Sequence, residues 1–203
     1  MALRQKDLEI ALQRLRGFET PDASLEQYST PAPIAAELLY IAYAMGDIQD
    51  RRVADLGCGP GPLGIGAALL GADTVIGLDV DGSAIVIARE NGAAAGVEMD
   101  LRVMDVREFQ EKVDTVVMNP PFGAQTRHAD SPFLLRAMQV ADRIYSLHNA
   151  GTERYLVELA GQERFTVFHR KIYKFEIKHQ FAFHTKAKKG IEVALLCFQR
   201  DGD

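Results

Sequence analysis

The sequence is poor in cysteine and has no long apolar run. Only two cysteines, Cys58 and Cys197, occur among 203 residues. Disulfide frameworks and zinc sites need more cysteines at closer spacing, so we expect neither. No stretch of about 18 apolar residues is present, and the chain opens without the pattern of a signal peptide. These absences predict a cytoplasmic protein with no metal site and no membrane partner.

The composition is that of a globular protein. Hydrophobic residues make up 47% of the chain and charged residues 25%. This balance and length predict one domain over residues 1–203, with a helical leader over residues 1–30. Apolar β-branched runs alternate with helical patterns along the chain. We therefore expect an α/β fold with a mostly parallel sheet and helices on both faces.

Positive charge is concentrated near one end of an acidic chain. The net charge is −5, which by itself argues against nucleic-acid binding. Residues 164–190, however, contain eight Lys or Arg against one acid, interleaved with Phe and Tyr. Such a basic strip suits phosphate contacts with base stacking, and Lys186, Lys188 and Lys189 are its candidate RNA contacts. Two amphipathic strands with core aromatics and solvated lysines would produce the same pattern.

The motif Asn119-Pro120-Pro121-Phe122-Gly123 follows a short apolar run over residues 113–118. Two prolines cannot extend a strand ladder, so the strand must end there and the backbone must turn. In an open α/β sheet, the carboxyl end of a strand is where ligands bind. A plain turn is the alternative interpretation, because Asn and Pro favour turns.

This motif has the chemistry to hold a planar amino group. The Asn119 side-chain oxygen and the Pro120 carbonyl are acceptors for the two hydrogens of an exocyclic NH2, and Phe122 can stack on the attached ring. The nitrogen lone pair of such a group is delocalised into the ring. Two fixed acceptors would draw the hydrogens out of plane and make the nitrogen a better nucleophile.

A glycine-rich turn lies upstream, after the expected strand at residues 52–56. Asp55 precedes Gly57-Cys58-Gly59-Pro60-Gly61, and a helix is expected over residues 63–70. Glycines let the backbone approach a ligand closely, as in nicotinamide, flavin and methyl-donor sites. A carboxylate at Asp55 would repel a pyrophosphate and would suit an ammonium or sulfonium group.

Two further strands are expected to end in acids. Asp79 follows residues 74–78, where it can bind both ribose hydroxyls of a nucleoside. Asp105 and Val106 follow residues 101–104, where they can meet an adenine ring. Each acid alone is as well explained by a turn or a helix cap. Four polar strand ends in one series favour a ligand site.

Polar residues near expected helix starts have alternative roles. Thr30, Ser131 and Thr152 are predicted N-caps, Thr30 before Pro31 and a helix over residues 32–45. The Gln27, Tyr28 and Thr30 cluster either lies over a ligand or belongs to a packed arm. We interpret His148, after an expected strand over residues 143–147, as structural.

In order and spacing, these motifs resemble those of class I S-adenosylmethionine-dependent methyltransferases that methylate amino groups. The segments Glu26-Gln27-Tyr28-Ser29-Thr30, Asn119-Pro120-Pro121-Phe122-Gly123 and Tyr145-Ser146-Leu147-His148 resemble those of the methyltransferase-like protein 5 family of rRNA adenine-N6 methyltransferases. The resemblance runs over residues 3–198. It implies a Rossmann-like seven-stranded sheet whose last strand is antiparallel.

The resemblance also implies a cofactor site and partners. It implies S-adenosylmethionine as cofactor, structured RNA such as small-subunit rRNA as substrate, and Asn119 to Phe122 as the catalytic motif. Related enzymes work with a small zinc-containing activator protein, for which the sheet edge at residues 101–106 is the expected docking site. The residues expected around the methyl donor are Gln27, Tyr28, Thr30, Asp55, Gly57, Cys58, Gly59, Pro60, Gly61, Pro62, Asp79, Val80, Asp105, Val106 and Asn119.

Two other functions fit parts of this pattern. A glutamine side chain presents the same planar NH2, but glutamine methyltransferases usually end the motif in Tyr and carry a separate substrate domain. An aromatic ring also stacks better on a base than on an aliphatic amide. A noncatalytic RNA-binding module with this fold is the other alternative. Both halves of the expected site are present, which favours an enzyme.

Overall fold

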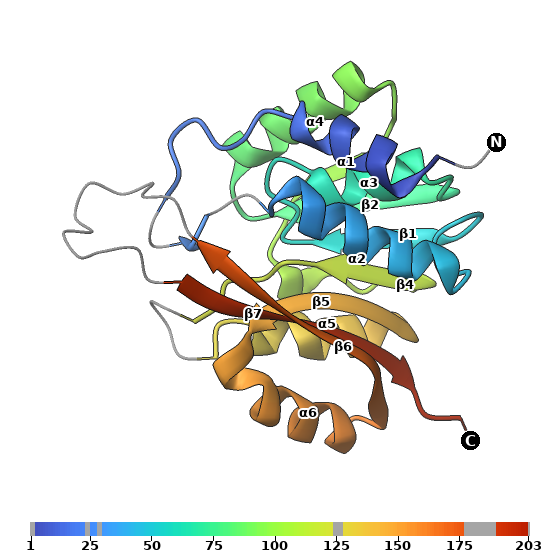
Figure 1. The fold of residues 1–203 in the computed structure, drawn as a ribbon, viewed down its shortest axis with the longest axis vertical. Coiled ribbons are helices and arrows are strands. Elements are labelled where there is room, and N and C mark those ends of the chain that lie inside the picture. Colours follow the sequence, from blue (N-terminus) through green and yellow to red (C-terminus); the bar gives the residue numbers. More distant parts are fainter. Residues whose placement is uncertain (1–2, 23–24, 28–29, 124–127, 177–189, 203) are drawn as a thin grey trace.

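The computed structural model contains one seven-stranded sheet with the strand order β3-β2-β1-β4-β5-β7-β6. It describes residues 3–22, 25–27, 30–123, 128–176 and 190–202. Strands β1 to β5 are parallel, and β7 pairs antiparallel with both β5 and β6. The predicted mixed sheet is therefore confirmed (Figure 1). The strands are β1 (Arg52–Leu56), β2 (Thr74–Asp79), β3 (Asp100–Val103), β4 (Thr115–Met118), β5 (Arg143–Asn149), β6 (Phe165–Glu176) and β7 (Gly190–Arg200).

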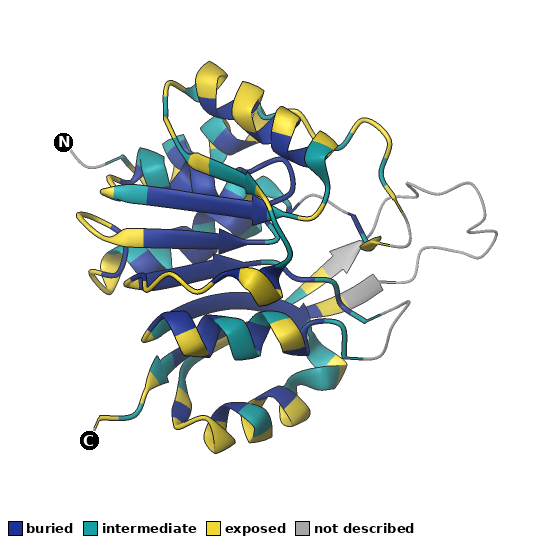
Figure 2. Ribbon diagram, turned by 180° about the vertical axis from the view of Figure 1, so that it is seen from behind, coloured by how far each residue is buried: buried dark blue, intermediate teal, exposed yellow. Residues whose placement is uncertain are grey.

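Helices cover both faces of the sheet. Helices α1, α2, α3 and α4 pack together over one face, and α5 and α6 cover the other (Figure 1). Strand β1 is buried along four of its five residues and β4 along its whole length, as expected for strands covered on both sides (Figure 2). The helices are α1 (Gln5–Gln13), α2 (Ala32–Ala44), α3 (Pro62–Leu69), α4 (Gly82–Ala95), α5 (Ser131–Val140) and α6 (Glu153–Gln162), with short 3-10 turns η2 (Val106–Glu108) and η3 (Ala150–Thr152). None of these described helices is both long and apolar enough to cross a membrane.

Two apolar clusters form the core, one on each side of the sheet. Phe109, Ile144 and Phe198 belong to the cluster under α5 and α6. Leu8 and Leu39 belong to the cluster that joins α1 and α2 to the opposite face. The helical leader is therefore part of the core.

The prediction that Thr30, Ser131 and Thr152 cap helices with their side chains is wrong, because none of the three helices has a side-chain cap hydrogen bond. Helix α2 begins after Pro31, and α5 begins with Ser131 itself, in both cases without a side-chain cap. Thr152 occupies the cap position of α6, but its hydroxyl donates to the carbonyl of Asn149. The Thr30 hydroxyl instead accepts a hydrogen bond from Asn119, which directly follows β4.

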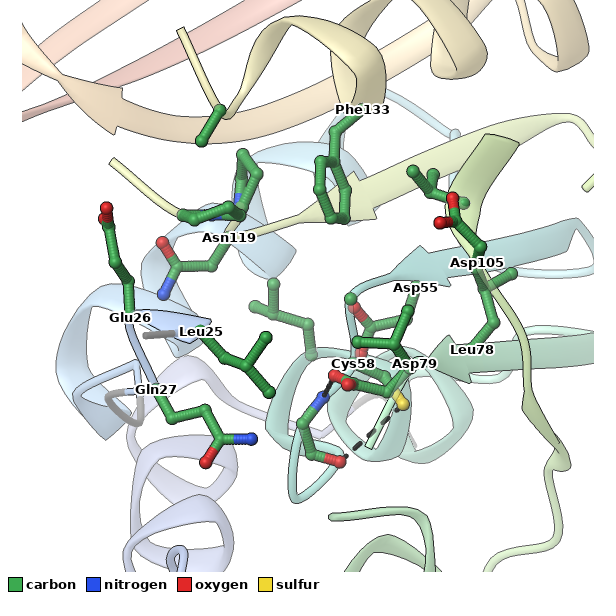
Figure 3. Close-up of a pocket in the computed structure, with 18 of the residues that line it drawn as sticks. Leu25, Glu26, Gln27, Asp55, Cys58, Leu78, Asp79, Asp105, Asn119 and Phe133 are labelled. Carbon is green, nitrogen blue, oxygen red and sulfur yellow. Dashed lines mark hydrogen bonds between the residues drawn. The ribbon is translucent and has the colours of Figure 1, made fainter. Parts of the chain in front are cut away.

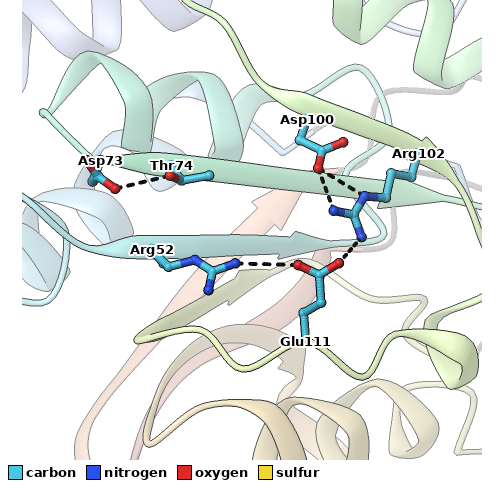
Figure 4. Close-up of polar contacts among 6 residues, drawn as sticks. All are labelled: Arg52, Asp73, Thr74, Asp100, Arg102 and Glu111. Carbon is cyan, nitrogen blue, oxygen red and sulfur yellow. Dashed lines mark hydrogen bonds and ion pairs between the residues drawn. The ribbon is translucent and has the colours of Figure 1, made fainter.

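Strand β3 is an edge of the sheet and pairs only with β2 among the described strands. Ion pairs join this edge to the chain beyond η2, because Arg102 contacts both Asp100 and Glu111, and Glu111 also contacts Arg52 (Figure 4). Val103, at the end of the strand, is 62% exposed. The prediction that the third strand lies at a sheet edge is thus confirmed.

Candidate active site

A cavity of about 310 Å³ lies at the carboxyl ends of β1, β2, β3 and β4 (Figure 3). The pairing register brings these ends together, since Leu56 pairs with both Leu78 and Met118, and Asp79 pairs with Val103. Most of the predicted site residues line this cavity. They are Gln27, Thr30, Asp55, Gly57, Cys58, Gly59, Pro60, Pro62, Asp79, Val80, Asp105, Val106, Asn119, Pro120 and Pro121.

Asp55 is a buried acid at the floor of the cavity. Its side chain is 1% exposed, and its Oδ2 accepts a hydrogen bond from the Gly64 backbone N–H at 2.7 Å, in the first turn of α3. The pKa of Asp55 is raised to about 7, chiefly by burial and to a smaller extent by the charge of Asp79, while the hydrogen bond from Gly64 acts in the opposite direction. A cationic ligand beside this carboxyl group would stabilise its ionised form, so the site favours a ligand with a positive charge.

The glycine-rich loop leaves no room for side chains at two positions. A Cβ on Gly57 would lie 2.9 Å from the Phe133 ring, and one on Gly59 would lie 2.9 Å from the Phe18 ring. Both glycines also have positive φ angles, of 73° and 52°. Because these positions have no side chain, the rings of Phe133 and Phe18 can pack directly against the loop.

Asp79 and Asp105 line the cavity while also fixing local backbone. Asp79 accepts from the Gly59 N–H at 2.8 Å and from the Asp81 N–H at 3.0 Å, and its burial raises its pKa. Asp105 caps η2 and pairs with Arg107, whose guanidinium lowers the pKa of Asp105 to about 2. Both acids therefore stabilise a turn and also line the cavity.

The N-terminal arm is defined as residues 16–30, and several of its described residues, including Phe18, Gln27 and Thr30, line the cavity. Gln27 donates to Asp81 Oδ2 at 2.7 Å, and its Oε1 accepts from the Asp22 backbone N–H at 2.8 Å. Asn91 fixes the start of the arm through hydrogen bonds with the Arg16 backbone, and it also donates to the Pro60 carbonyl. Tyr28 lies outside the described residues. Asn91 was not predicted because it lies within the helical pattern of α4, where nothing local marks its partners.

Asn119 presents an unused hydrogen-bond acceptor at the cavity. Its Nδ2 donates to the Thr30 hydroxyl at 2.9 Å. Its Oδ1 is buried and, among the described residues, has no hydrogen-bond partner. Buried polar atoms are nearly always paired, so an orphan acceptor at a cavity marks a place for a donor from a ligand.

Phe122 lies away from the cavity, whereas Phe133 faces it. The Phe122 ring is 6% exposed and belongs to the apolar cluster that contains Leu39. Phe133, on α5, lines the cavity beside Asp105 and Asn119 (Figure 3). A stacking role for Phe122 would therefore require its ring to leave this cluster or a base to reach its edge. Phe133 gave no signal in the sequence because it follows a helical apolar pattern.

His148 is fully buried near the end of β5. Its Nδ1 lies 2.9 Å from Asp130 Oδ2, and Asp130 is also buried. This contact ties the start of α5 to the sheet. The buried pairing supports the structural interpretation of this histidine.

The described part of the basic strip is largely packed and paired. Phe165 is buried, Arg170 pairs with Glu153 on α6, and Lys171 pairs with Glu37 on α2. For this part of the strip, the interpretation as amphipathic strands is the one supported. Lys186, Lys188 and Lys189 lie outside the described residues.

The chain is similar to known methyltransferases over its whole length. Residues 34–167 match the family model "Methyltransferase small domain". The rRNA N(6)-adenosine-methyltransferase METTL5 of Danio rerio is 36% identical over 208 residues, which cover 97% of this chain and 99% of that protein. A candidate RNA methyltransferase from Pyrococcus horikoshii has a crystal structure with 44% identity, full coverage of both chains and a TM-score of 0.92.

A more distant structure extends the likeness in fold. Magnesium protoporphyrin IX methyltransferase from Synechocystis, solved with S-adenosylmethionine, is 18% identical with a TM-score of 0.64 over 82% of this chain and 78% of that one. This likeness concerns the fold alone. The matching family model and the two closer relatives show that the chain belongs to the methyltransferase-like protein 5 family of class I S-adenosylmethionine-dependent methyltransferases.

Proposed function

We propose that this methyltransferase transfers a methyl group to the N6 atom of an adenine in structured RNA, with small-subunit rRNA as its substrate. The observation that carries the proposal is the buried Oδ1 of Asn119, a residue of the cavity lining, which has no hydrogen-bond partner within the described part of the chain. An amino group supplies the donor that this acceptor lacks. The METTL5 relative of Danio rerio is named for this reaction, which supports the same acceptor here.

The cavity residues fit S-adenosylmethionine, a cofactor that supplies an electrophilic methyl group on a sulfonium. Asp55 would bind its ammonium group, because a buried acid with a raised pKa favours a cation. Asp79 would accept from the ribose hydroxyls, and Asp105 with Val106 would contact the adenine. Gly57 and Gly59 line the cavity beside the space that the cofactor would occupy. Gln27, Tyr28, Thr30, Cys58, Pro60, Gly61, Pro62 and Val80 would complete the surroundings.

Asn119 and Pro120 would orient the acceptor. Their oxygens would hold the two hydrogens of the amino group and so direct the nitrogen lone pair toward the methyl donor. The nitrogen becomes positively charged as its new bond forms, so no strong base is needed before transfer. The target base must be unpaired or flipped out, which costs a few kcal/mol of stacking and pairing.

We also propose that a small zinc-containing activator protein adds a strand to the edge at residues 101–106. The open edge of β3 and the exposed Val103 side chain support this placement. Val103→Asp places a charge on the exposed edge and should change the chain's own stability by less than about 0.5 kcal/mol. We expect the variant to lose stimulation by the added activator while keeping its basal rate. Equal stimulation of both proteins would argue against this docking site.

The acceptor class is tested by transfer of labelled methyl groups to rRNA fragments and, in parallel, to glutamine-containing peptides. We expect label in RNA alone. Label in peptides would establish the glutamine reaction instead. Cofactor binding without transfer to either acceptor, with or without added activator, would favour a noncatalytic RNA-binding module.

A further inference from the structure

The acceptor-site amide is held by a residue from the N-terminal arm. The Thr30 hydroxyl accepts a hydrogen bond from Asn119 Nδ2 at 2.9 Å, across 89 positions of sequence. Thr30 is 8% exposed, so water competes little for this contact. The hydroxyl therefore has a tertiary role in place of the cap that its position before Pro31 predicts.

In this contact Thr30 pairs with the donor end of the amide. A carboxamide has a donor end and an acceptor end, and rotation about its last bond exchanges them. With Nδ2 directed at Thr30, Oδ1 is the end left without a partner among the described residues. The amide thus presents an acceptor where an amino group needs one.

Described residues on either side of Thr30 make hydrogen bonds of their own. The backbone beyond it enters α2, whose first turn bonds the Pro31 carbonyl through the amides of Ile34 and Ala35. On the other side, Gln27 bonds Asp81 at the start of α4, next to the cofactor-side acid Asp79. The described residues of the arm therefore contact Asp81 through Gln27 and the acceptor amide through Thr30.

We propose that Thr30 is a positioning residue of the acceptor site, which acts through Asn119 to hold its Oδ1 in the orientation that receives the amino group. This positioning role is additional to the cofactor contact that the family resemblance implies for Thr30. It rests on the proposed function, in which the group that accepts the methyl is an amino group. Without the hydroxyl, Nδ2 loses its partner, and the amide plane is free to rotate.

The test compares Thr30→Val with Thr30→Ser. Valine keeps the shape and β-branching but cannot accept a hydrogen bond, whereas serine keeps the hydroxyl. We expect Thr30→Val to lower kcat about 100-fold, the scale expected when a reacting group is misplaced by about 1 Å. The KM for RNA should stay near wild type, and Thr30→Ser should retain most of the rate. Because Thr30 also lines the cavity, the Kd for S-adenosylhomocysteine should weaken slightly in Thr30→Val, by far less than the fall in kcat. A loss of cofactor affinity that matches the loss of rate, or an active valine variant, would overturn the proposal.

A second measurement needs no acceptor substrate. In protein labelled with ¹⁵N-asparagine, the side-chain NH2 signals of Asn119 are assigned by their loss in Asn119→Ala. We expect their exchange with solvent to be slow in the wild type and in Thr30→Ser, and fast in Thr30→Val. Equal exchange in all three would overturn the proposal. Absence of RNA methylation by the wild type would instead contradict the proposed function and leave this readout to decide the role of Thr30.

Discussion

Asp55 shows how burial gives a single acid a functional property. The carboxyl group is enclosed beneath the glycine-rich loop, with one backbone hydrogen bond from Gly64. Burial raises its pKa from an ordinary 3.8 to about 7, since the charged form loses its solvation. This raised pKa predicts that the free protein binds a proton at Asp55 under mildly acidic conditions.

This proton predicts a pH-dependent affinity for the cofactor. A ligand with an ammonium group stabilises the ionised carboxylate, so the proton must leave Asp55 before binding. We expect the affinity for S-adenosylhomocysteine to fall about tenfold for each pH unit below 7 and to level off above it. Isothermal titration calorimetry between pH 5.5 and 8.5 measures this slope.

Asp55→Asn is the matched control for the titration. The variant keeps an oxygen for the Gly64 N–H but carries no charge, so it should bind more weakly at pH 8 and show a smaller slope. Some slope should remain, because burial also raises the pKa of Asp79. An affinity that is independent of pH in the wild type would contradict a role for Asp55 in binding the cation.

At the scale of elements, the N-terminal arm depends on one buried asparagine. Asn91 is 3% exposed and makes three hydrogen bonds, two to the Arg16 backbone and one to the Pro60 carbonyl. Asn91→Ala should lower the free energy of unfolding by about 2–4 kcal/mol, at roughly 1 kcal/mol for each bond lost. It should also weaken cofactor binding, because the arm and the glycine-rich loop lose their link. Chemical denaturation and calorimetry check the two effects.

The neighbouring Glu90 offers a control for this prediction. Glu90 pairs with the Arg16 side chain on the surface, where both groups are about half exposed. Glu90→Gln should change stability by less than about 1 kcal/mol. If both variants lowered stability equally, the buried asparagine would not be the link between the arm and the loop.

The elements themselves were largely predictable, and their tertiary partners were not. Apolar runs ended by prolines or acids predicted β1, β2 and β4 to within two residues. The pattern before Pro31 located the start of α2 but assigned the Thr30 hydroxyl to a local cap. Its actual partner, Asn119, lies on another strand end, and only the folded sheet brings the two together. Local patterns contain no information about such contacts.

At the scale of the whole molecule, topology explains why most residues that line the cavity could be named from the sequence. Neighbouring parallel strands end at one edge of the sheet, so polar residues at four successive strand ends had to meet. The side on which each aromatic ring packs does not follow from this rule. Phe122 and Phe133 both follow apolar patterns, yet only Phe133 lines the cavity.

Under the proposed function, the charge distribution of the whole chain predicts which residues contact RNA. An acidic protein with a net charge of −5 needs a local basic surface to hold phosphates. The arginine and lysine at positions 170 and 171 already pair with acids, so we assign RNA contact to Lys186, Lys188 and Lys189. Changing these three to Glu should weaken RNA binding and flatten its dependence on salt, as measured by fluorescence anisotropy. Unaltered binding would indicate that these lysines are merely solvated.

The most direct test is mass spectrometry of nucleosides from rRNA incubated with the purified protein and labelled S-adenosylmethionine. Asn119→Ala, with its cofactor affinity checked by calorimetry, serves as the control. We predict labelled N6-methyladenosine with the wild type and none with Asn119→Ala, which should still bind cofactor nearly as tightly. Label on another nucleoside, or equal label from both proteins, would contradict the proposed reaction or the role of Asn119.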